Sequence, residues 1–165
     1  MIKKKVCMLG AFATGKTSLV QRYVHSIFSD KYHTTVGVKI EKIQVSVDDI
    51  PVDLIIWDLH GEDDFQHVRL SYLKGSSGCI YVVDGTRRTT LVTAMNLKEI
   101  VEKTIGEFPF ILVVNKSDLK NEWEIDPLTL EELQDQGIPV IEASAKTGIE
   151  VEQAFQLLTK KMMDE

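Results

Sequence analysis

The chain has 165 residues, of which 44% are hydrophobic and 27% charged, proportions typical of a soluble globular protein with its own core. Its 25 acidic and 19 basic residues give a net charge of -6, which argues against a protein that binds nucleic acid through charge alone. We therefore expect a single domain over residues 1–165 and no nucleic-acid partner.

Short apolar runs alternate with helical patterns along the chain. Five runs have the length of strands buried on both faces of a mostly parallel sheet: residues 6–9, 54–57, 79–83, 110–114 and 140–141. Helical spacing of apolar residues predicts helices at 17–24, 90–105, 126–136 and 151–162. Residues 38–47 and 52–57 are joined by only four residues, so we expect an antiparallel hairpin there. This alternation predicts an α/β layer fold.

The two cysteines and the chain's last residues bear on where the protein works. Cys7 and Cys79 lie inside apolar runs, which favours buried, reduced thiols and a reducing compartment. No stretch approaches 18 apolar residues, and no cysteine near the end of the chain offers a site for a lipid. We expect a cytoplasmic protein without a direct lipid anchor, which reaches a membrane only through a partner or a segment outside this chain.

Residues 10–17 fit the pattern G-x-x-x-x-G-K-[ST] between a predicted strand and a predicted helix. Glycines there let the backbone curl so that several N–H groups converge on phosphates. Lys16 would reach the β- and γ-phosphates, and the Thr17 hydroxyl would bind Mg²⁺. The alternative is a glycine-rich turn without a ligand. The predicted phosphate site comprises Gly10, Ala13, Thr14, Gly15, Lys16, Thr17 and Ser18.

A second motif, Asn115-Lys116-Ser117-Asp118, follows directly after the predicted strand at 110–114. Its side chains therefore emerge at the carboxyl edge of the sheet, where ligands of open α/β sheets bind. The Asp118 carboxylate can accept hydrogen bonds from N1–H and the 2-amino group of guanine, which adenine does not present. Taken alone the motif is a common loop composition, and its position about 100 residues after the phosphate loop favours a guanine site.

These motifs resemble those of small GTPases of the Ras superfamily, and the resemblance covers nearly the whole chain. It implies a P-loop NTPase (Ras-like) fold, a six-stranded mixed sheet with one antiparallel strand flanked by five helices, as one GTPase domain. It also implies GTP or GDP with Mg²⁺. Residues 142–146 resemble the segment E-x-S-A-K, which implies that Ser144, Ala145 and Lys146 lie at the base, with the Ala145 N–H on guanine O6. Phe28 resembles the aromatic residue that contacts the base edge.

The same resemblance assigns the two switch segments. Thr35 resembles the switch I threonine that binds Mg²⁺ and the γ-phosphate, and Asp58 resembles the switch II aspartate that holds Mg²⁺ through water. Gly61 would sense the γ-phosphate through its N–H group. The residues given catalytic roles in this way are Lys16, Thr35, Gly61 and Glu62. Residues 35–38 and 71–75 resemble the Rab branch most closely.

The chain departs from the family at the γ-phosphate. Glu62 replaces the glutamine that orients the attacking water, and Leu59 and His60 before it also differ from the family pattern. Phe12 stands where the family usually has Gly or Ser, so its ring would occupy the space of an arginine finger, or would fold outward onto switch II and change little. The leading interpretation is a GTP-hydrolysing molecular switch. The alternative is a nucleotide-binding interaction module, a pseudo-GTPase with little or no hydrolysis.

Partners of such a switch read the nucleotide state through the two switch segments. Rab-like proteins present three hydrophobic side chains to effectors, and the matching positions are Ile40, Trp57 and Tyr72. An aromatic pair at a surface is a reasonable centre for protein binding. The alternative is that Trp57 and Tyr72 only pack within the protein.

The acidic side chain of Glu62 generates a first prediction. A carboxylate polarises water more strongly than an amide does but brings negative charge toward the γ-phosphate, and these two effects oppose each other. We expect hydrolysis that does not depend on Glu62 in the usual way, so single-turnover GTP hydrolysis by Glu62→Gln should stay within about tenfold of the unchanged protein. A larger fall in the rate would contradict this.

Overall fold

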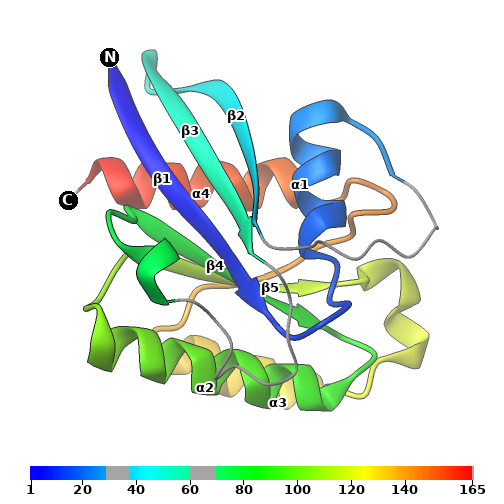
Figure 1. Ribbon diagram of the computed structural model, residues 1–165. Coiled ribbons are helices and arrows are strands. Elements are labelled where there is room, and N and C mark those ends of the chain that lie inside the picture. The colour runs from blue at the N-terminus through cyan, green and yellow to red at the C-terminus, as the bar shows by residue number, and fades with distance from the viewer. Residues whose placement is uncertain (29–37, 60–69, 165) are drawn as a thin grey trace.

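Six strands form one sheet in the order β2-β3-β1-β4-β5-β6 (Figure 1). The computed structural model describes residues 1–28, 38–59 and 70–164. Among the described strands, β2 and β3 are the antiparallel pair, and every other neighbouring pair is parallel. The strands are β1 (Ile2–Gly10), β2 (Val38–Val47), β3 (Ile50–Leu59), β4 (Gly78–Asp84), β5 (Phe110–Asn115) and β6 (Val140–Glu142).

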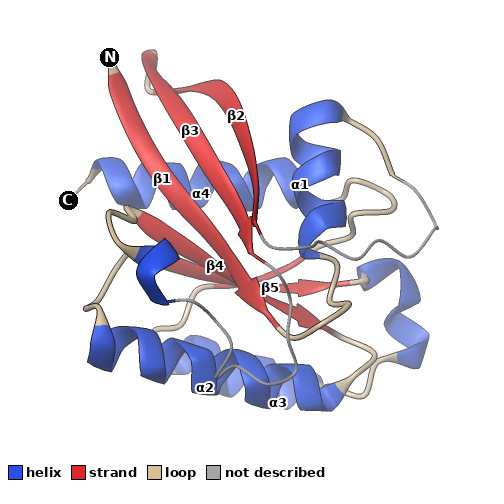
Figure 2. Ribbon diagram, in the orientation of Figure 1, coloured by secondary structure: helices blue, strands red, loops and turns tan. Residues whose placement is uncertain are grey.

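Helices cover both faces of this sheet (Figure 2). The described residues contain the α-helices α1 (Lys16–His25), α2 (Arg88–Thr104), α3 (Pro127–Asp135) and α4 (Val151–Met163) and the 3-10 helices η2 (Leu70–Leu73) and η3 (Ser117–Glu122). Helices α1 and α4 pack on one face, and α2 and α3 pack on the other. The predicted fold class, a Ras-like mixed α/β sheet with one antiparallel pair, is confirmed.

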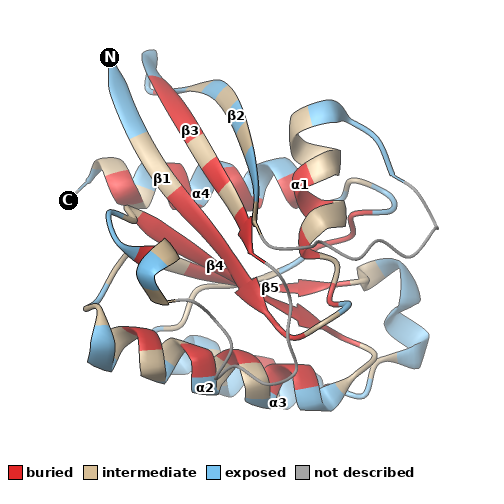
Figure 3. Ribbon diagram, viewed as in Figure 1, coloured by how far each residue is buried: buried red, intermediate tan, exposed pale blue. Residues whose placement is uncertain are grey.

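The period-2 geometry of the strands divides the core between the two faces. In β1, Val6 and Met8 pack toward α1 and α4, whereas Cys7 and Leu9 pack toward α2. All of these side chains are buried, as Figure 3 shows for the centre of the sheet. A strand that is buried on both faces reads as a continuous apolar run, and this explains why the parallel strands were visible in the sequence.

The β2–β3 hairpin is tighter than the sequence indicated. The predicted connection of residues 48–51 is wrong in length, because β3 already begins at Ile50, which pairs with Val47. Asp48 and Asp49 alone form the turn, with φ of +52° and +66°. Both central residues of a type I′ turn need a positive φ, and aspartate tolerates this conformation better than most residues do. The antiparallel pairing itself is confirmed.

The two cysteines lie opposite each other on β1 and β4. Both are buried and free. Burial is the main cause that raises the pKa of the Cys7 thiol and of the Cys79 thiol, so both stay protonated at neutral pH. The expectation of buried, reduced thiols is confirmed. Separately, no helix in the described ranges has the length and hydropathy needed to cross a membrane.

Neighbouring leucines of α4 give a matched test of the core. Leu158 is fully buried against the sheet, whereas Leu157 is 37% exposed. Leu158→Ala should lower the free energy of unfolding by about 2–5 kcal/mol, because the substitution leaves a cavity in a packed site. Leu157→Ala should change the free energy of unfolding by about 0.5 kcal/mol or less, measured by urea unfolding. Equal losses for the two variants would contradict this packing.

Candidate nucleotide-binding site

The loop between β1 and α1 has a backbone that only glycine fits at two positions. Gly10 has φ +150°, and a Cβ there would lie 2.5 Å from the carbonyl oxygen of Val82. Gly15 has φ +98°, and a Cβ there would lie 2.2 Å from Asn115 Nδ2. Such distances exclude a side chain, so the two fixed glycines of the motif allow the loop to curl tightly against β4 and β5.

Lys16 lies inside this curl. Its side chain is buried, and Nζ donates to the carbonyl oxygens of Gly10 (3.1 Å) and Ala11 (2.8 Å). A buried ammonium is costly unless it is hydrogen bonded, and here the loop itself supplies the acceptors. Lys16 also begins α1, whose first N–H groups have no acceptor within the helix. The loop therefore combines a fixed cation with backbone donors, which suits a bound phosphate chain.

Thr17 and Asp58 meet beside this loop, as expected for a shared metal site. Thr17 Oγ1 donates to Asp58 Oδ2 over 2.6 Å. Thr17 is in the first turn of α1, and the buried Asp58 is near the end of β3. A hydroxyl and a carboxylate are hard oxygen ligands of the kind that Mg²⁺ prefers, so the two residues fit that ion.

Asn115 connects the two predicted motifs. It is buried at the end of β5, where its Nδ2 donates to the carbonyl oxygen of Thr14 (3.0 Å) and its Oδ1 accepts from the Ala145 N–H (3.1 Å). The loops that contain Thr14, Asn115 and Ala145 thus converge at the carboxyl edge of the sheet. The sequence predicted this convergence, although it gave the Ala145 N–H to guanine O6, and in the structure this N–H bonds to Asn115.

Asp118 lies at the surface beside the loop that follows β6. Its Oδ1 accepts from Ser144 Oγ over 2.8 Å, and Ser144 itself is fully buried. Ser144 Oγ also accepts from the Thr147 N–H over 3.1 Å. A carboxylate has two acceptor oxygens, so Asp118 is oriented through one and keeps acceptor capacity on the other. This arrangement suits a ligand that offers two adjacent N–H donors.

Lys146 and Phe28 are both exposed, Lys146 in the loop that follows β6 and Phe28 shortly after the end of α1. Arg22 of α1 fixes the loop that contains Lys146, because its Nε donates to the Ala145 carbonyl oxygen (2.8 Å) and its Nη2 donates to the Lys146 carbonyl oxygen. No role for Arg22 was predicted from the sequence. Its helical position was visible, but the distant acceptors were not.

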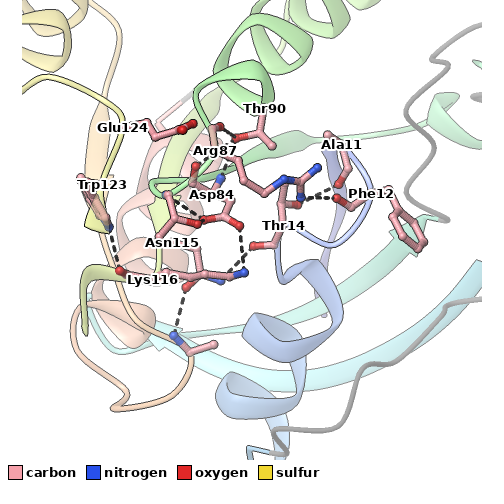
Figure 4. A network of polar contacts seen from close by, with 12 residues as sticks. Ala11, Phe12, Thr14, Asp84, Arg87, Thr90, Asn115, Lys116, Trp123 and Glu124 are labelled. Atoms are coloured by element: carbon pink, nitrogen blue, oxygen red, sulfur yellow. Dashed lines mark hydrogen bonds and ion pairs between the residues drawn. The ribbon is translucent and has the colours of Figure 1, made fainter. Parts of the chain in front are cut away.

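An ion pair between a partly exposed lysine and a buried aspartate behind the base loop was also missed. Lys116 Nζ lies 2.8 Å from Asp84 Oδ2, and Asp84 is fully buried at the end of β4 (Figure 4). Trp123 Nε1 donates to the Lys116 carbonyl oxygen over 2.8 Å. The signal in the sequence was an aspartate that ends an apolar run at the carboxyl edge, the same place at which Asn115 ends β5.

The three hydrophobic residues expected at an effector surface lie together. Ile40 of β2 and Trp57 of β3 are opposite each other in the hairpin, and Ile40 is 52% exposed. The rings of Trp57 and Tyr72 are 6.1 Å apart between centroids. Lys5 Nζ lies 3.8 Å from the centroid of the Trp57 ring and donates to the Tyr72 carbonyl oxygen (2.5 Å). Lys5 therefore holds the half-buried pair of Trp57 and Tyr72 in place. Ile40 is the most exposed of the three hydrophobic residues.

Comparison with known proteins identifies the family. A family model described as "Ras family" matches residues 5–164. The chain belongs to the Ras family. It is 32% identical over 163 residues to the Ras-related protein Rab-7b of Bos taurus, covering 96% of this chain and 82% of that protein. It is 33% identical over 166 residues to the Ras-related protein Rab7 of Drosophila melanogaster, covering 97% of this chain and 80% of that protein. The Ras-related protein Rab-7b of Homo sapiens is 32% identical over 164 residues, covering 96% of this chain and 82% of that protein.

The Ras-family chain is therefore a small GTPase close to the Rab proteins, as the short motifs predicted. Ras and Rab GTPases generally bind GTP and GDP with Mg²⁺ and act on effectors as switches. Three predicted residues of its switches, Thr35, Gly61 and Glu62, lie outside the described residues, as does His60.

Proposed function

We propose that this chain binds GTP and GDP with Mg²⁺ as one GTPase domain over residues 1–165 and hydrolyses GTP to GDP and phosphate. The observation that carries the proposal is the convergence of a phosphate loop with a buried Lys16 and a carboxylate at Asp118, joined through Asn115. Each part alone has an ordinary structural explanation. Their placement at one edge of the sheet is what a nucleotide needs, because its phosphates and its base must be held at the same time.

Selection of the base would depend on Asp118. The Ser144 hydroxyl holds one carboxylate oxygen, and this leaves the group able to accept from N1–H and the 2-amino group of guanine. Adenine offers neither donor in that position, so its binding would leave the carboxylate unpaired. A site built in this way rejects the wrong base by roughly 10⁴-fold. Phe28 and Lys146 would pack on the base, and the Ala145 N–H would be shared between Asn115 and guanine O6.

The phosphates would lie in the loop of residues 10–15 and at the start of α1. Lys16 would neutralise charge on the β- and γ-phosphates, and Thr17, Asp58 and Thr35 would hold Mg²⁺. When bound, Mg²⁺ would supply positive charge that offsets the negative charge of the phosphates. The backbone donors of the loop and of the first turn of α1, where Ser18 lies, would hold the phosphates in line for attack by water.

Little or no hydrolysis is the second candidate, and the sequence next to the γ-phosphate favours it. Phe12, Leu59, His60 and Glu62 all differ from the family pattern. The Phe12 ring points away from Asp84 and Thr14 (Figure 4), so it does not fill the loop that would hold the phosphates. The loop therefore stays able to bind a nucleotide even if the residues that differ from the family pattern do not support hydrolysis.

Effectors would bind at the surface formed by Ile40, Trp57 and Tyr72. The partly exposed aromatic pair offers a large contact area with little side-chain freedom to lose. Ile40 adds an exposed apolar side chain beside the aromatic pair. In this proposal the nucleotide state reaches partners through the switch segments that flank the β2–β3 hairpin.

Base selection is tested with Asp118→Asn. An asparagine would place an N–H group where the carboxylate accepts, so the affinity for GDP should fall by about 100-fold or more, while binding of ADP stays weak. Glu122→Gln is the matched control, because Glu122 is an exposed carboxylate of the same 3-10 helix, and it should leave GDP affinity unchanged. Titration with fluorescent GDP and ADP measures both. Equal affinity of the unchanged protein for GDP and ADP would refute the guanine site.

Hydrolysis is tested by identifying the bound nucleotide over time. Protein loaded with GTP and Mg²⁺ in a single-turnover experiment should contain GDP after minutes to hours, as measured by mass analysis. Lys16→Ala should abolish this conversion, because the ammonium is the fixed cation of the phosphate loop. Persistence of GTP in the unchanged protein would instead support the interaction module.

A further inference from the structure

The phosphate loop is held from outside by an arginine that lies in neither motif. Arg87 Nη1 donates to the carbonyl oxygen of Phe12 over 2.8 Å (Figure 4). This partly buried contact joins residues that are 75 positions apart in the sequence. Hydrogen bonds from a charged donor are stronger than neutral ones, and partial burial reduces competition from water. The contact therefore restrains a loop whose own backbone is strained, since Ala13 has φ +61°.

The position of Arg87 is fixed by its own backbone contacts. Its N–H donates to the carbonyl oxygen of Asp84 (2.9 Å), and its carbonyl oxygen accepts from Thr90 Oγ1 (2.7 Å). Thr90 is fully buried, and its Oγ1 also accepts from the Asp84 N–H (2.9 Å). The Arg87 side chain thus extends from a turn at the start of α2 whose backbone is held by hydrogen bonds.

That turn is anchored on the base loop as well. Asp84 pairs with Lys116, and the Gly85 N–H donates to the carbonyl oxygen of Asn115 over 3.1 Å. A Cβ at Gly85 would lie 2.2 Å from the Trp123 ring, so the ring packs directly on the backbone of the turn. Residues 84–88 therefore form a rigid connector between the base loop and the phosphate loop.

The geometry of the peptide bond gives this contact a consequence for the loop. In a trans peptide the carbonyl oxygen of one residue and the N–H of the next point in opposite directions. Because Arg87 fixes the Phe12 carbonyl oxygen on its own side, the Ala13 N–H is directed to the other side. An N–H group held in this direction needs no reorientation when an anion binds, and such preorganisation strengthens binding.

We propose that Arg87 is a positioning residue of the phosphate loop, which slows nucleotide release by fixing the Phe12–Ala13 peptide. This inference rests on the proposed function, since it concerns how tightly the same loop retains a nucleoside diphosphate. Arg87 acts through the loop backbone and not on the base. Its loss should therefore weaken retention of different purine diphosphates by the same factor.

The test compares release of fluorescent GDP and fluorescent inosine diphosphate, in Mg²⁺, from the unchanged protein and three variants. Inosine diphosphate lacks only the 2-amino group, so it reports on the base site. Arg87→Ala should release both nucleotides about tenfold faster, which corresponds to loss of one charge-assisted hydrogen bond. Arg87→Lys should recover part of the loss, because an ammonium can donate but lacks the reach and fork of a guanidinium. Arg88→Ala is the matched control and should stay within about twofold, since Arg88 donates to Glu124 through its backbone N–H, which the substitution keeps.

Each outcome supports or overturns the inference. Unchanged release from Arg87→Ala overturns it, as does a changed ratio of GDP to inosine diphosphate release, which would place the effect at the base. If Arg87→Ala does not fold, Arg87→Lys decides, and release at the rate of the unchanged protein overturns the inference. If the unchanged protein retains GDP and only these variant results fail, the proposed function stands. If it retains neither nucleotide, both fail.

Discussion

The side chain of Asn115 uses both ends of its amide at once, and the relative position of three loops depends on it. Its donor binds the carbonyl oxygen of Thr14 and its acceptor binds the Ala145 N–H. The amide is buried, so either end left unpaired would be costly. Its Nδ2 also occupies the space that a side chain at residue 15 would need, which explains the glycine there. The phosphate loop and the loops expected to hold the base thus form one structural unit.

The strands were predictable to the extent that burial determines sequence. β4 and β5 are covered on both faces, and their apolar runs nearly match their observed bounds. β1 was predicted as residues 6–9 but begins at Ile2, although Lys3, Lys4 and Lys5 follow. These lysines pair in register with residues 53–55 of β3, so the ladder of backbone hydrogen bonds extends the strand where its side chains are no longer buried. Hydropathy reports burial, and it does not report backbone pairing.

A similar distinction applies to the site. The phosphate loop and the Asn115–Asp118 motif were readable because each is a short contiguous pattern whose residues act together. The partners of Asp84 and Arg87 were not readable, because they are distant in the sequence and come into contact only after the sheet has formed. The N-cap of α3 is by contrast a local contact, because Asp126 accepts from the N–H of Leu128 two residues later. What sequence reasoning missed are contacts between loops, and these depend on topology.

The two tryptophans of the chain lie in different surroundings. Trp57 of the β2–β3 hairpin contacts Lys5 and Tyr72, whereas Trp123 packs on Gly85 and donates to the carbonyl oxygen of Lys116 behind the base loop. A nearby cation or a backbone carbonyl changes the emission of an indole ring, so each tryptophan would report on its own region. Replacing either indole by phenylalanine would leave a protein with one built-in spectroscopic probe, and no dye would have to be attached.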